Sequence, residues 1–234
     1  MVLGNGLLAN AFSAFKDDKD VFVFASGVSN SKENNPLEFD KELQLLKDKI
    51  RDNIGVKLIY FSTCSIFDNS ISGSPYITHK MEMEKFIIKH SERFLVFRLP
   101  NVVGQTSNPN TFFNFFKTKI LSGDTIHIQE NATRYLIDLR DLSELLPIMI
   151  NEEAFENKIL NVCFDNQMLV SEIIGLYEQL LNVNANKVMV PGGATYQIEN
   201  KEFIDFLTVK GIQPKINYNH QILKHYLSQL SSNL

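Results

Sequence analysis

The sequence predicts an α/β protein built on a parallel β-sheet that helices cover on both faces. Its 234 residues are ample for one hydrophobic core, or for one core with a smaller lobe attached, and 44% of them are hydrophobic. Short runs of β-branched and aromatic residues alternate with segments of helical apolar spacing. This order of strand, helix, strand and helix is typical of parallel sheets.

The predicted elements begin with a strand at residues 1–3, a glycine turn, and a helix from Leu7 to about Phe15. Residues 1–165 are predicted to form the domain that contains the sheet. Residues 166–234, where the pattern is mixed and more polar, are predicted to form a small C-terminal substrate lobe, with a contribution from residues 105–135. The further strands are Val21–Ala25, Val56–Phe61 and Phe94–Leu99, and the further helices are Leu37–Arg51, Tyr76–His90 and Phe112–Leu121.

Composition argues against several classes of function. The net charge is −4 with both signs interspersed, so the chain lacks the basic stripe that a nucleic-acid partner requires. Apolar runs reach about six residues, against roughly 18–20 for a membrane span, so no membrane association is expected. The N-terminus shows no secretory pattern, and the sequence has only two cysteines. A cytoplasmic protein is therefore expected.

The glycine turn has the spacing Gly4-x-Gly6-x-x-Ala9, between a predicted strand and a predicted helix. In that context Gly4 allows the tight turn, Gly6 lets the backbone approach a pyrophosphate, and Ala9 keeps the helix close to the sheet. The spacing therefore predicts a dinucleotide site. A glycine turn without a ligand is the simpler alternative.

Tyr76 and Lys80 are one helical turn apart, so they share one face of the predicted helix. A nearby ammonium, together with a cofactor's charge, stabilises phenolate and lowers the tyrosine pKa from about 10. Tyr76 is therefore a candidate proton donor or acceptor for an alcohol or ketone. Alternatively, Lys80 pairs with Glu84, which is four residues further along.

Four segments in order strengthen this interpretation. Together they resemble the extended short-chain dehydrogenase/reductase family, which comprises nucleotide-sugar epimerases, dehydratases and ketoreductases. The segments are Tyr60–Phe67, Phe97–Gly104, Arg134–Leu142 and Ile159–Val162.

The resemblance implies a Rossmann-like sheet, NAD or NADP as cofactor, and a nucleotide-sugar substrate. It assigns catalysis to Thr63, Tyr76 and Lys80, with Lys80 holding the nicotinamide ribose hydroxyls. It assigns substrate binding to Thr63, Asn101 and Arg134, with Arg134 at the sugar nucleotide's diphosphate. The residues implied at the cofactor are Gly4, Gly6, Leu7, Leu8, Ala25, Ser26, Gly27, Ser62, Tyr76, Lys80, Pro100, Asn101 and Val102.

Simpler roles remain open for several of these residues. Thr63 could cap the turn after its strand, Asn101 could satisfy loop backbone, and Arg134 could form a surface ion pair. Cys64 is interpreted as a packed side chain rather than a nucleophile, because no histidine lies beside it. The five histidines show no metal-ligand spacing, so no metal site is expected.

The chain is shorter than the family pattern, because only one strand and one helix fit between the first helix and Val56. The segment Asp20–Asn30 resembles the family's fourth strand, although spacing alone equally allows the second. In either case the sheet should have fewer strands than usual on the adenosine side. In dinucleotide-binding proteins an acidic residue that follows the glycine turn binds the ribose. In this sequence its place falls near Ser26 and Gly27, neither of which is acidic. A partner subunit in a homodimer would complete such a site, or cofactor affinity would be poor.

The residues after Thr63 narrow the choice among the reactions of this family. Family dehydratases that resemble this chain carry Asp-Glu there, whereas this chain has Cys64 and Ser65, neither of which is a competent acid at neutral pH. A 4,6-dehydratase is therefore disfavoured. A 4-ketoreductase, slightly ahead of a 4-epimerase, is the hypothesis that remains. The alternative is a non-catalytic regulatory or nucleotide-binding relative with a degenerate cofactor site.

Overall fold

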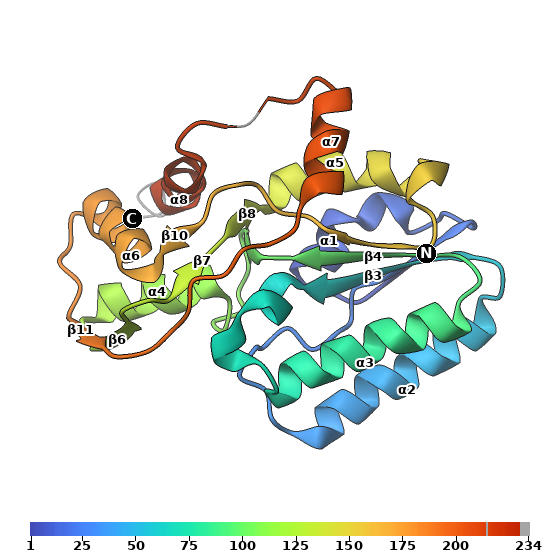
Figure 1. Ribbon diagram of the computed structural model, residues 1–234, viewed down its shortest axis with the longest axis horizontal. Coiled ribbons are helices and arrows are strands. Elements are labelled where there is room, and N and C mark those ends of the chain that lie inside the picture. The colour runs from blue at the N-terminus through green and yellow to red at the C-terminus, as the bar shows by residue number, and fades with distance from the viewer. Residues whose placement is uncertain (214, 230–234) are drawn as a thin grey trace. The chain divides into compact units, whose positions relative to one another are not determined.

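The computed structural model describes residues 1–213 and 215–229, which fall into two compact units (Figure 1). Unit 1 comprises residues 1–66, 71–99 and 139–162. Among the described residues, unit 2 comprises residues 67–70, 100–138, 163–213 and 215–229. Across the described part of the chain, no helix combines the length and the apolar character that crossing a membrane requires.

Unit 1 contains a five-stranded sheet in which every neighbouring pair is parallel, in the order β1-β2-β3-β4-β9. The predicted α/β class with a parallel sheet is thus confirmed. The interior strands β2 and β3 are buried along their whole length, which explains the apolar and aromatic residues of β2 and of Leu58–Phe61 in β3. The strands are β1 (Val2–Leu3), β2 (Val21–Phe24), β3 (Lys57–Thr63), β4 (Phe94–Leu99) and β9 (Lys158–Asn161).

Helices cover both faces of this sheet (Figure 1). Helices α2 (Pro36–Asp52) and α3 (Pro75–His90) lie side by side on one face, and α1 (Leu7–Ala11) and α5 (Leu139–Ile150) contact each other on the other face. Both α2 and α3 begin with proline behind a polar cap: Asn35 accepts from the amide of Leu37, and Ser74 from that of Ile77.

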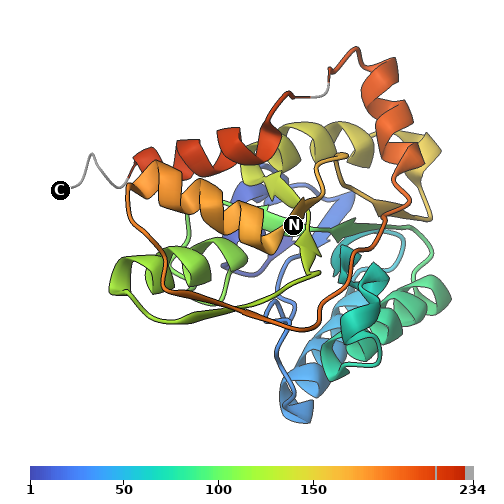
Figure 2. The same ribbon diagram turned by 60° about the vertical axis from the view of Figure 1, so that its left-hand side comes forward.

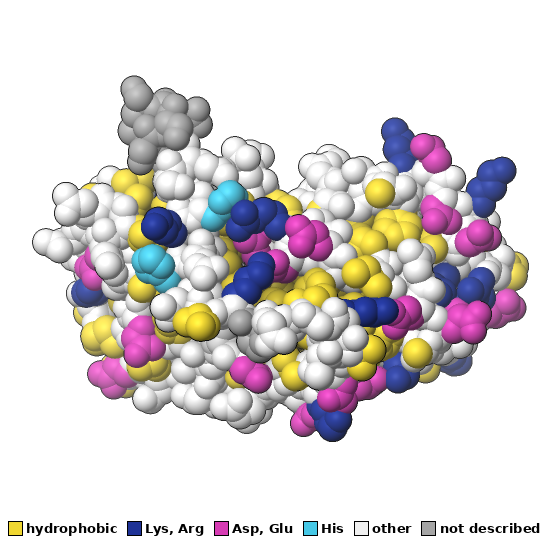
Figure 3. Space-filling model, turned by 90° about the horizontal axis from the view of Figure 1, so that it is seen from above, with side chains coloured by type: hydrophobic (Ala, Val, Ile, Leu, Met, Phe, Trp, Pro, Cys, Tyr) yellow, Lys and Arg dark blue, Asp and Glu magenta, His cyan; other side chains and the backbone are white. Residues whose placement is uncertain are grey.

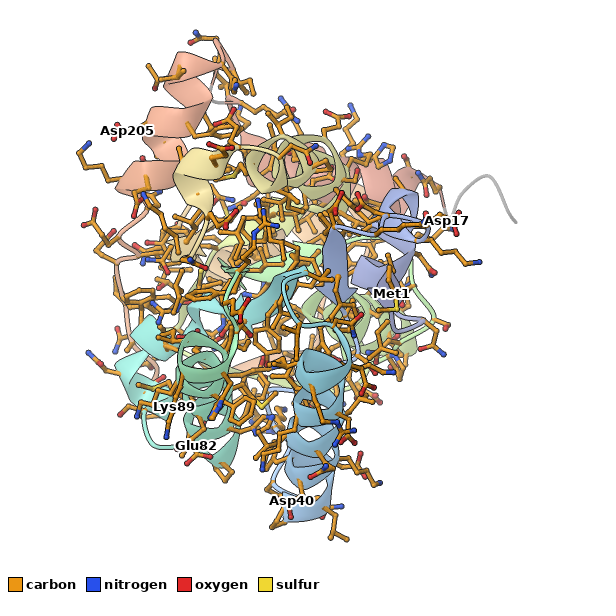
Figure 4. The ribbon with its side chains drawn as sticks, turned by 90° about the vertical axis from the view of Figure 1, so that its right-hand side faces the viewer. Met1, Asp17, Asp40, Glu82, Lys89 and Asp205 are labelled. Carbon is orange, nitrogen blue, oxygen red and sulfur yellow. The ribbon has the colours of Figure 1, made fainter. Side chains whose placement is uncertain are left out.

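The layer between the sheet and these two helices holds an apolar cluster that includes Phe24, Leu46, Met83, Ile87 and Val96. The opposite faces of the helices carry charged and polar side chains, together with a few exposed apolar ones such as Leu37 and Ile88. Figure 4 shows this arrangement at three labelled positions, with Asp40 on α2 and Glu82 and Lys89 on α3 pointing away from the sheet. The helical period of the apolar residues therefore specifies which side of each helix packs on the strands.

The first helix is shorter than predicted. The sequence indicated a helix from Leu7 to about Phe15, but α1 ends at Ala11 and a 3₁₀ turn follows over Ser13–Phe15. Phe12 and Phe15 are both buried, and a 3₁₀ turn places side chains three residues apart on the same side. Packing of these two rings therefore overrides the continuation of the α-helix.

The position of β2 decides between the two strand assignments that spacing left open. β2 pairs with β1 on one side and with β3 on the other. In a doubly wound sheet the fourth strand occupies that place, whereas the second would lie beyond β1. The segment Asp20–Asn30 therefore contains the counterpart of the fourth strand, and within residues 1–213 and 215–229 the sheet ends at β1.

Unit 2 consists of helices and three two-stranded pairs. Helix α6 contacts both α8 and α4, as Figure 2 shows. The helices are α4 (Phe112–Ser122), α6 (Val170–Leu181), α7 (Lys201–Val209) and α8 (Tyr218–Ser228). The strand pairs are β5 (Asn101–Val103) with β8 (Leu136–Asp138), β6 (Ile126–Gln129) with β11 (Lys187–Val190), and β7 (Thr133–Arg134) with β10 (Met168–Leu169). The other 3₁₀ turns are Cys64–Phe67, Asn69–Ile71 and Glu153–Phe155.

Acidic and basic side chains are interspersed on the face of the molecule in Figure 3. Such a surface presents no extended field of one sign to a polyanion.

Replacing Leu46 by alanine should lower the free energy of unfolding by about 2–5 kcal/mol, because the side chain is fully buried and its loss leaves a cavity. The matched control is Leu37→Ala on the same helix, where the side chain is 65% exposed and little change is expected. Urea denaturation followed by circular dichroism measures both. Equal losses in the two variants would contradict the packing described for α2.

Candidate active site

Tyr76 and Lys80 lie in the first two turns of α3, on the side of the helix that faces β3. Both side chains are buried, Tyr76 at 7% and Lys80 at 3% exposure. The cap of Ser74 on the amide of Ile77 fixes where the helix begins and so fixes the direction of both side chains.

Thr63 is the last residue of β3, and the structure brings it close enough to Tyr76 for its hydroxyl to act on the pKa of the phenol. The Thr63 hydroxyl also accepts from the amide of Ser65 at 3.0 Å. Thr63 therefore caps the turn after its strand, as the simpler interpretation stated, and also contacts the candidate catalytic phenol. In parallel sheets the carboxyl ends of the strands are where ligands bind.

The pKa of Tyr76 differs from the expectation. Burial and the carboxylate of Glu42 raise it to about 12, although the hydroxyl of Thr63 acts in the opposite direction. The expected lowering, which combined an ammonium with a cofactor's charge, stays a prediction, but Lys80 by itself does not lower this pKa. The reason is that the ammonium of Lys80 is directed to another group.

That group is the carboxylate of Glu42 on α2. The Lys80 Nζ donates to Glu42 Oε1 at 3.0 Å and to the hydroxyl of Tyr60 at 2.9 Å. The alternative pairing of Lys80 with Glu84 is therefore wrong. Glu84 instead forms a two-point ion pair with Arg98, at 2.6 and 2.9 Å.

Glu42 accepts four hydrogen bonds in a nearly water-free position. Oε1 accepts from Tyr60 (2.6 Å) and Lys80, and Oε2 accepts from the amide of Val28 (2.6 Å) and lies 2.9 Å from His79 Nε2. Burial by itself would raise the pKa of this carboxyl. Lys80, His79, Tyr60 and the Val28 amide outweigh burial and lower the pKa to about 2. Glu42 is therefore ionised at any ordinary pH.

Ser62, which was predicted to lie at the cofactor, is buried and donates from its hydroxyl to Glu84 Oε1 at 2.5 Å. Cys64 is buried and donates to the carbonyl of Arg98 at 3.2 Å, and burial raises the pKa of its thiol. Both side chains act as packed, internally bonded groups in this geometry.

The glycine turn packs against the end of β2. Gly4 has φ +126°, and a Cβ there would lie 2.4 Å from the carbonyl oxygen of Ala25, so only glycine fits. A Cβ on Gly6 would have no atom within 4 Å, so open space lies next to that residue. Leu7 and Leu8 follow in α1 and are half-buried. With five residues, α1 is too short to supply the helix-terminus attraction for anions that the sequence suggested.

The loop after β2, residues 25–28, lies directly on the Glu42–Lys80 pair. A Cβ on Gly27 would lie 2.7 Å from Glu42 Oε1 and 2.9 Å from Lys80 Nζ. Ala25, Ser26 and Gly27 were all predicted at the cofactor. In the structure this loop covers the lysine with which they were expected to cooperate.

The remaining predicted residues belong to unit 2. Pro100 precedes β5, and Asn101 and Val102 lie in this strand. The side-chain amide of Asn101 donates to the carbonyl of Tyr135 at 3.2 Å, so it satisfies backbone, which was the simpler role considered for it. Arg134 donates to Asp68 Oδ2 at 3.0 Å and to the carbonyl of Thr133 at 2.7 Å. Asp68 is only 1% exposed, so this pair is more than a surface contact.

Sequence reasoning missed Glu42, Tyr60 and Asp68. A signal for Glu42 was present, because it lies four residues before Leu46 and so occupies the apolar face of the predicted helix. A charged residue on such a face indicates a buried partner. Asp68 follows the strand end without comparable periodicity, so the sequence carried no signal for it.

No protein-family model matches this sequence, and no curated protein is significantly similar to it. Solved structures do match its fold. The dTDP-glucose 4,6-dehydratase of Bacillus anthracis in complex with NAD matches with a TM-score of 0.72 and 15% identity, over 99% of this chain and 79% of that one.

Two further structures match similarly. The UDP-glucose 4-epimerase of Thermus thermophilus in complex with NAD has a TM-score of 0.71 and 15% identity, over 98% of this chain and 84% of that one. The Pseudomonas aeruginosa protein named RMD, complexed with NADPH, has a TM-score of 0.66 and 16% identity, over 99% of this chain and 89% of that one. The Rossmann-like fold that the family resemblance implied is confirmed by these matches.

The low pKa of Glu42 predicts acid-sensitive stability. Because the folded pKa of about 2 is below the ordinary 4.5, the stabilisation is complete above pH 4.5 and is lost as the pH falls toward 2. Between pH 6 and pH 3 the wild type should lose about 2 kcal/mol more than Glu42→Gln does. Urea denaturation at the two pH values measures this difference.

The control for this experiment is Glu38→Gln, an exposed position on the same helix, which should keep the pH dependence of the wild type. Identical pH dependence in the wild type and in Glu42→Gln would show that Glu42 is not held as the ionised partner of Lys80.

Proposed function

We propose that this protein is an NAD(P)-dependent enzyme that acts on a nucleotide-linked sugar, by reduction of a 4-keto group or by 4-epimerisation. The observation that carries the proposal is that Thr63, at the carboxyl end of β3, is close enough to Tyr76 to lower the pKa of its phenol. A hydroxyl beside a phenol in that place can orient a substrate oxygen and exchange a proton with it. The NAD and NADPH complexes of proteins with this fold support the choice of cofactor.

The residues fit the two ends of a dinucleotide unequally. At the glycine turn, the open space beside Gly6 and the close packing of Gly4 on Ala25 suit the approach of a diphosphate. At the adenosine end, the described sheet stops at β1, so the described residues contain no second strand whose end would carry an acidic residue for the ribose. The glycine turn therefore leaves room for a diphosphate, although α1 is too short to add a helix-terminus attraction, and the fit at the adenosine is poor. When bound, the cofactor would supply or accept the hydride.

The protein's own side chains would then handle protons and orientation. Tyr76 would pass a proton between its phenol oxygen and the sugar oxygen, and Thr63 would hold that oxygen in place. In unit 2, Arg134 would meet the diphosphate of the sugar nucleotide. Its pairing with the buried carboxylate of Asp68 would keep the guanidinium in one orientation for that contact.

Reduction or epimerisation is favoured over dehydration because the residues after Thr63 supply no acid and base pair. Cys64 is buried, bonded to a carbonyl, and has a raised thiol pKa. Such a thiol neither protonates nor deprotonates a departing hydroxyl at neutral pH.

The second candidate is a non-catalytic relative that binds a nucleotide or sugar nucleotide without turnover. One observation favours it: Lys80 is 3% exposed and already bonded to Glu42 and Tyr60. A lysine in that arrangement does not lower the pKa of Tyr76. The two candidates differ in whether removing the Tyr76 hydroxyl has any functional consequence.

Replacing Tyr76 by phenylalanine should lower turnover of the enzyme about 10²–10⁴-fold while leaving the fold intact, because the variant loses only the proton-transferring oxygen. Turnover is measured as NADH or NADPH oxidation across a panel of nucleotide 4-keto-sugars. The matched control is Tyr177→Phe, which removes a phenol bonded to the carbonyl of Phe113 in unit 2 and should keep the wild-type rate. Binding without turnover, with Tyr76→Phe equal to wild type, would instead favour the second candidate.

Cofactor stoichiometry separates the two reactions. A ketoreductase consumes one reduced cofactor for each sugar converted, since the hydride remains in the product. An epimerase returns the hydride to the sugar in each turnover, so its cofactor is unchanged over many turnovers. We expect one-to-one consumption, measured by absorbance of the reduced cofactor against product formed. Product formation without net oxidation would contradict the reductase assignment and support the epimerase.

A further inference from the structure

The Glu42–Lys80 pair has a direct consequence for cofactor binding if the proposed function holds, and the inference that follows rests on that function. The Lys80 ammonium has three N–H donors, and among the described residues it donates to Glu42 and Tyr60. Its nitrogen also lies 5.0 Å from the centroid of the Tyr60 ring. At 3% exposure, it has almost no surface left for a ligand.

Glu42 is anchored independently of Lys80. Its second oxygen accepts from the amide of Val28 and lies against His79 Nε2, whose ring stacks on Phe39 at 4.6 Å. These contacts come from the loop after β2, from α3 and from α2 itself. The carboxylate is therefore held in place from several directions, and Lys80 is drawn to it rather than the reverse.

The loop of residues 25–28 closes over this pair. The Val28 amide is bonded to Glu42 at 2.6 Å, and Gly27 packs so closely on the pair that even a methyl group would collide with it. A ligand that approaches Lys80 from this side must displace the loop. Displacing the loop in turn removes one of the four partners of Glu42.

We propose that Glu42 is a positioning residue that competes with the cofactor for Lys80. In this arrangement the lysine either pairs with Glu42 under the closed loop or binds the ribose hydroxyls of the cofactor with the loop shifted. An ionised carboxylate is a stronger partner for an ammonium than a neutral hydroxyl. Glu42 therefore weakens cofactor binding, and the chain binds NADH or NADPH less tightly than the same chain with a neutral residue at position 42.

The test compares binding of NADH and of NADPH to the wild type and to Glu42→Gln, by the fluorescence of the reduced cofactor. Glutamine removes the charge and keeps one acceptor oxygen, which can serve the Val28 amide, while its NH2 group can donate to the hydroxyl oxygen of Tyr60. We expect the Kd of Glu42→Gln to be about tenfold lower than that of the wild type. If Glu42 had a purely structural role, Glu42→Gln would bind the cofactor more weakly than the wild type. The direction in which the Kd changes therefore distinguishes the two roles.

Glu38→Gln, at an exposed position of α2, is the matched control and should leave the Kd unchanged. An equal or higher Kd in a natively folded Glu42→Gln protein would overturn the inference while leaving the proposed function intact. Absence of binding by both proteins at millimolar NADH and NADPH would overturn the proposed function as well.

A second measurement needs no variant and so remains decisive if Glu42→Gln does not fold. Amide hydrogen exchange of Val28 is followed by NMR in the wild type, with and without saturating NADH or NADPH. Because the inference requires the Val28–Glu42 bond to open when the cofactor binds, we expect faster exchange at Val28 in the complex. Unchanged or slower exchange in the saturated protein would overturn the inference.

Discussion

A charged carboxylate buried between α2 and the sheet determines how unit 1 is organised around its candidate site. An unpaired buried charge is costly, so Glu42 is compatible with the fold only together with all of its partners. Those partners come from the loop after β2, from β3 and from α3. The same contacts that satisfy Glu42 also fix Lys80 and close the loop of residues 25–28. Stability and the chemistry of Tyr76 are thereby linked through one side chain.

A second ion pair, between the buried Glu84 and the partly exposed Arg98, shows that α3 meets the strands through a polar stripe as well as an apolar one. Tyr76, Lys80 and Glu84 follow one another at intervals of four residues, and each meets a polar side chain of β3: Thr63, Tyr60 and Ser62 respectively. Glu84 also reaches Arg98 on β4. Polar contacts therefore join α3 to β3 in addition to the apolar packing between them.

The fold, and the residues that share one face of a helix, could be predicted from the sequence. The partners of the charged groups could not. Strand β4 was predicted with its observed bounds, and the starts of α2, α3 and α4 to within one residue, because apolar period and polar caps are local signals. The choice between a second and a fourth strand for β2 depended on pairing across the sheet, which spacing does not encode. The partner of Lys80 is 38 residues away on another helix, so the i, i+4 rule selected the wrong carboxylate.

The place where the sheet ends also affects how the molecule behaves in solution. β1 contributes only two residues, and among the described strands its single neighbour is β2. An exposed edge strand is ordinarily a template on which another extended chain can pair and nucleate aggregation. A margin of two residues offers too few backbone donors and acceptors to hold such a chain. The brevity of β1 thus protects a shortened sheet from self-association that a longer bare margin would invite.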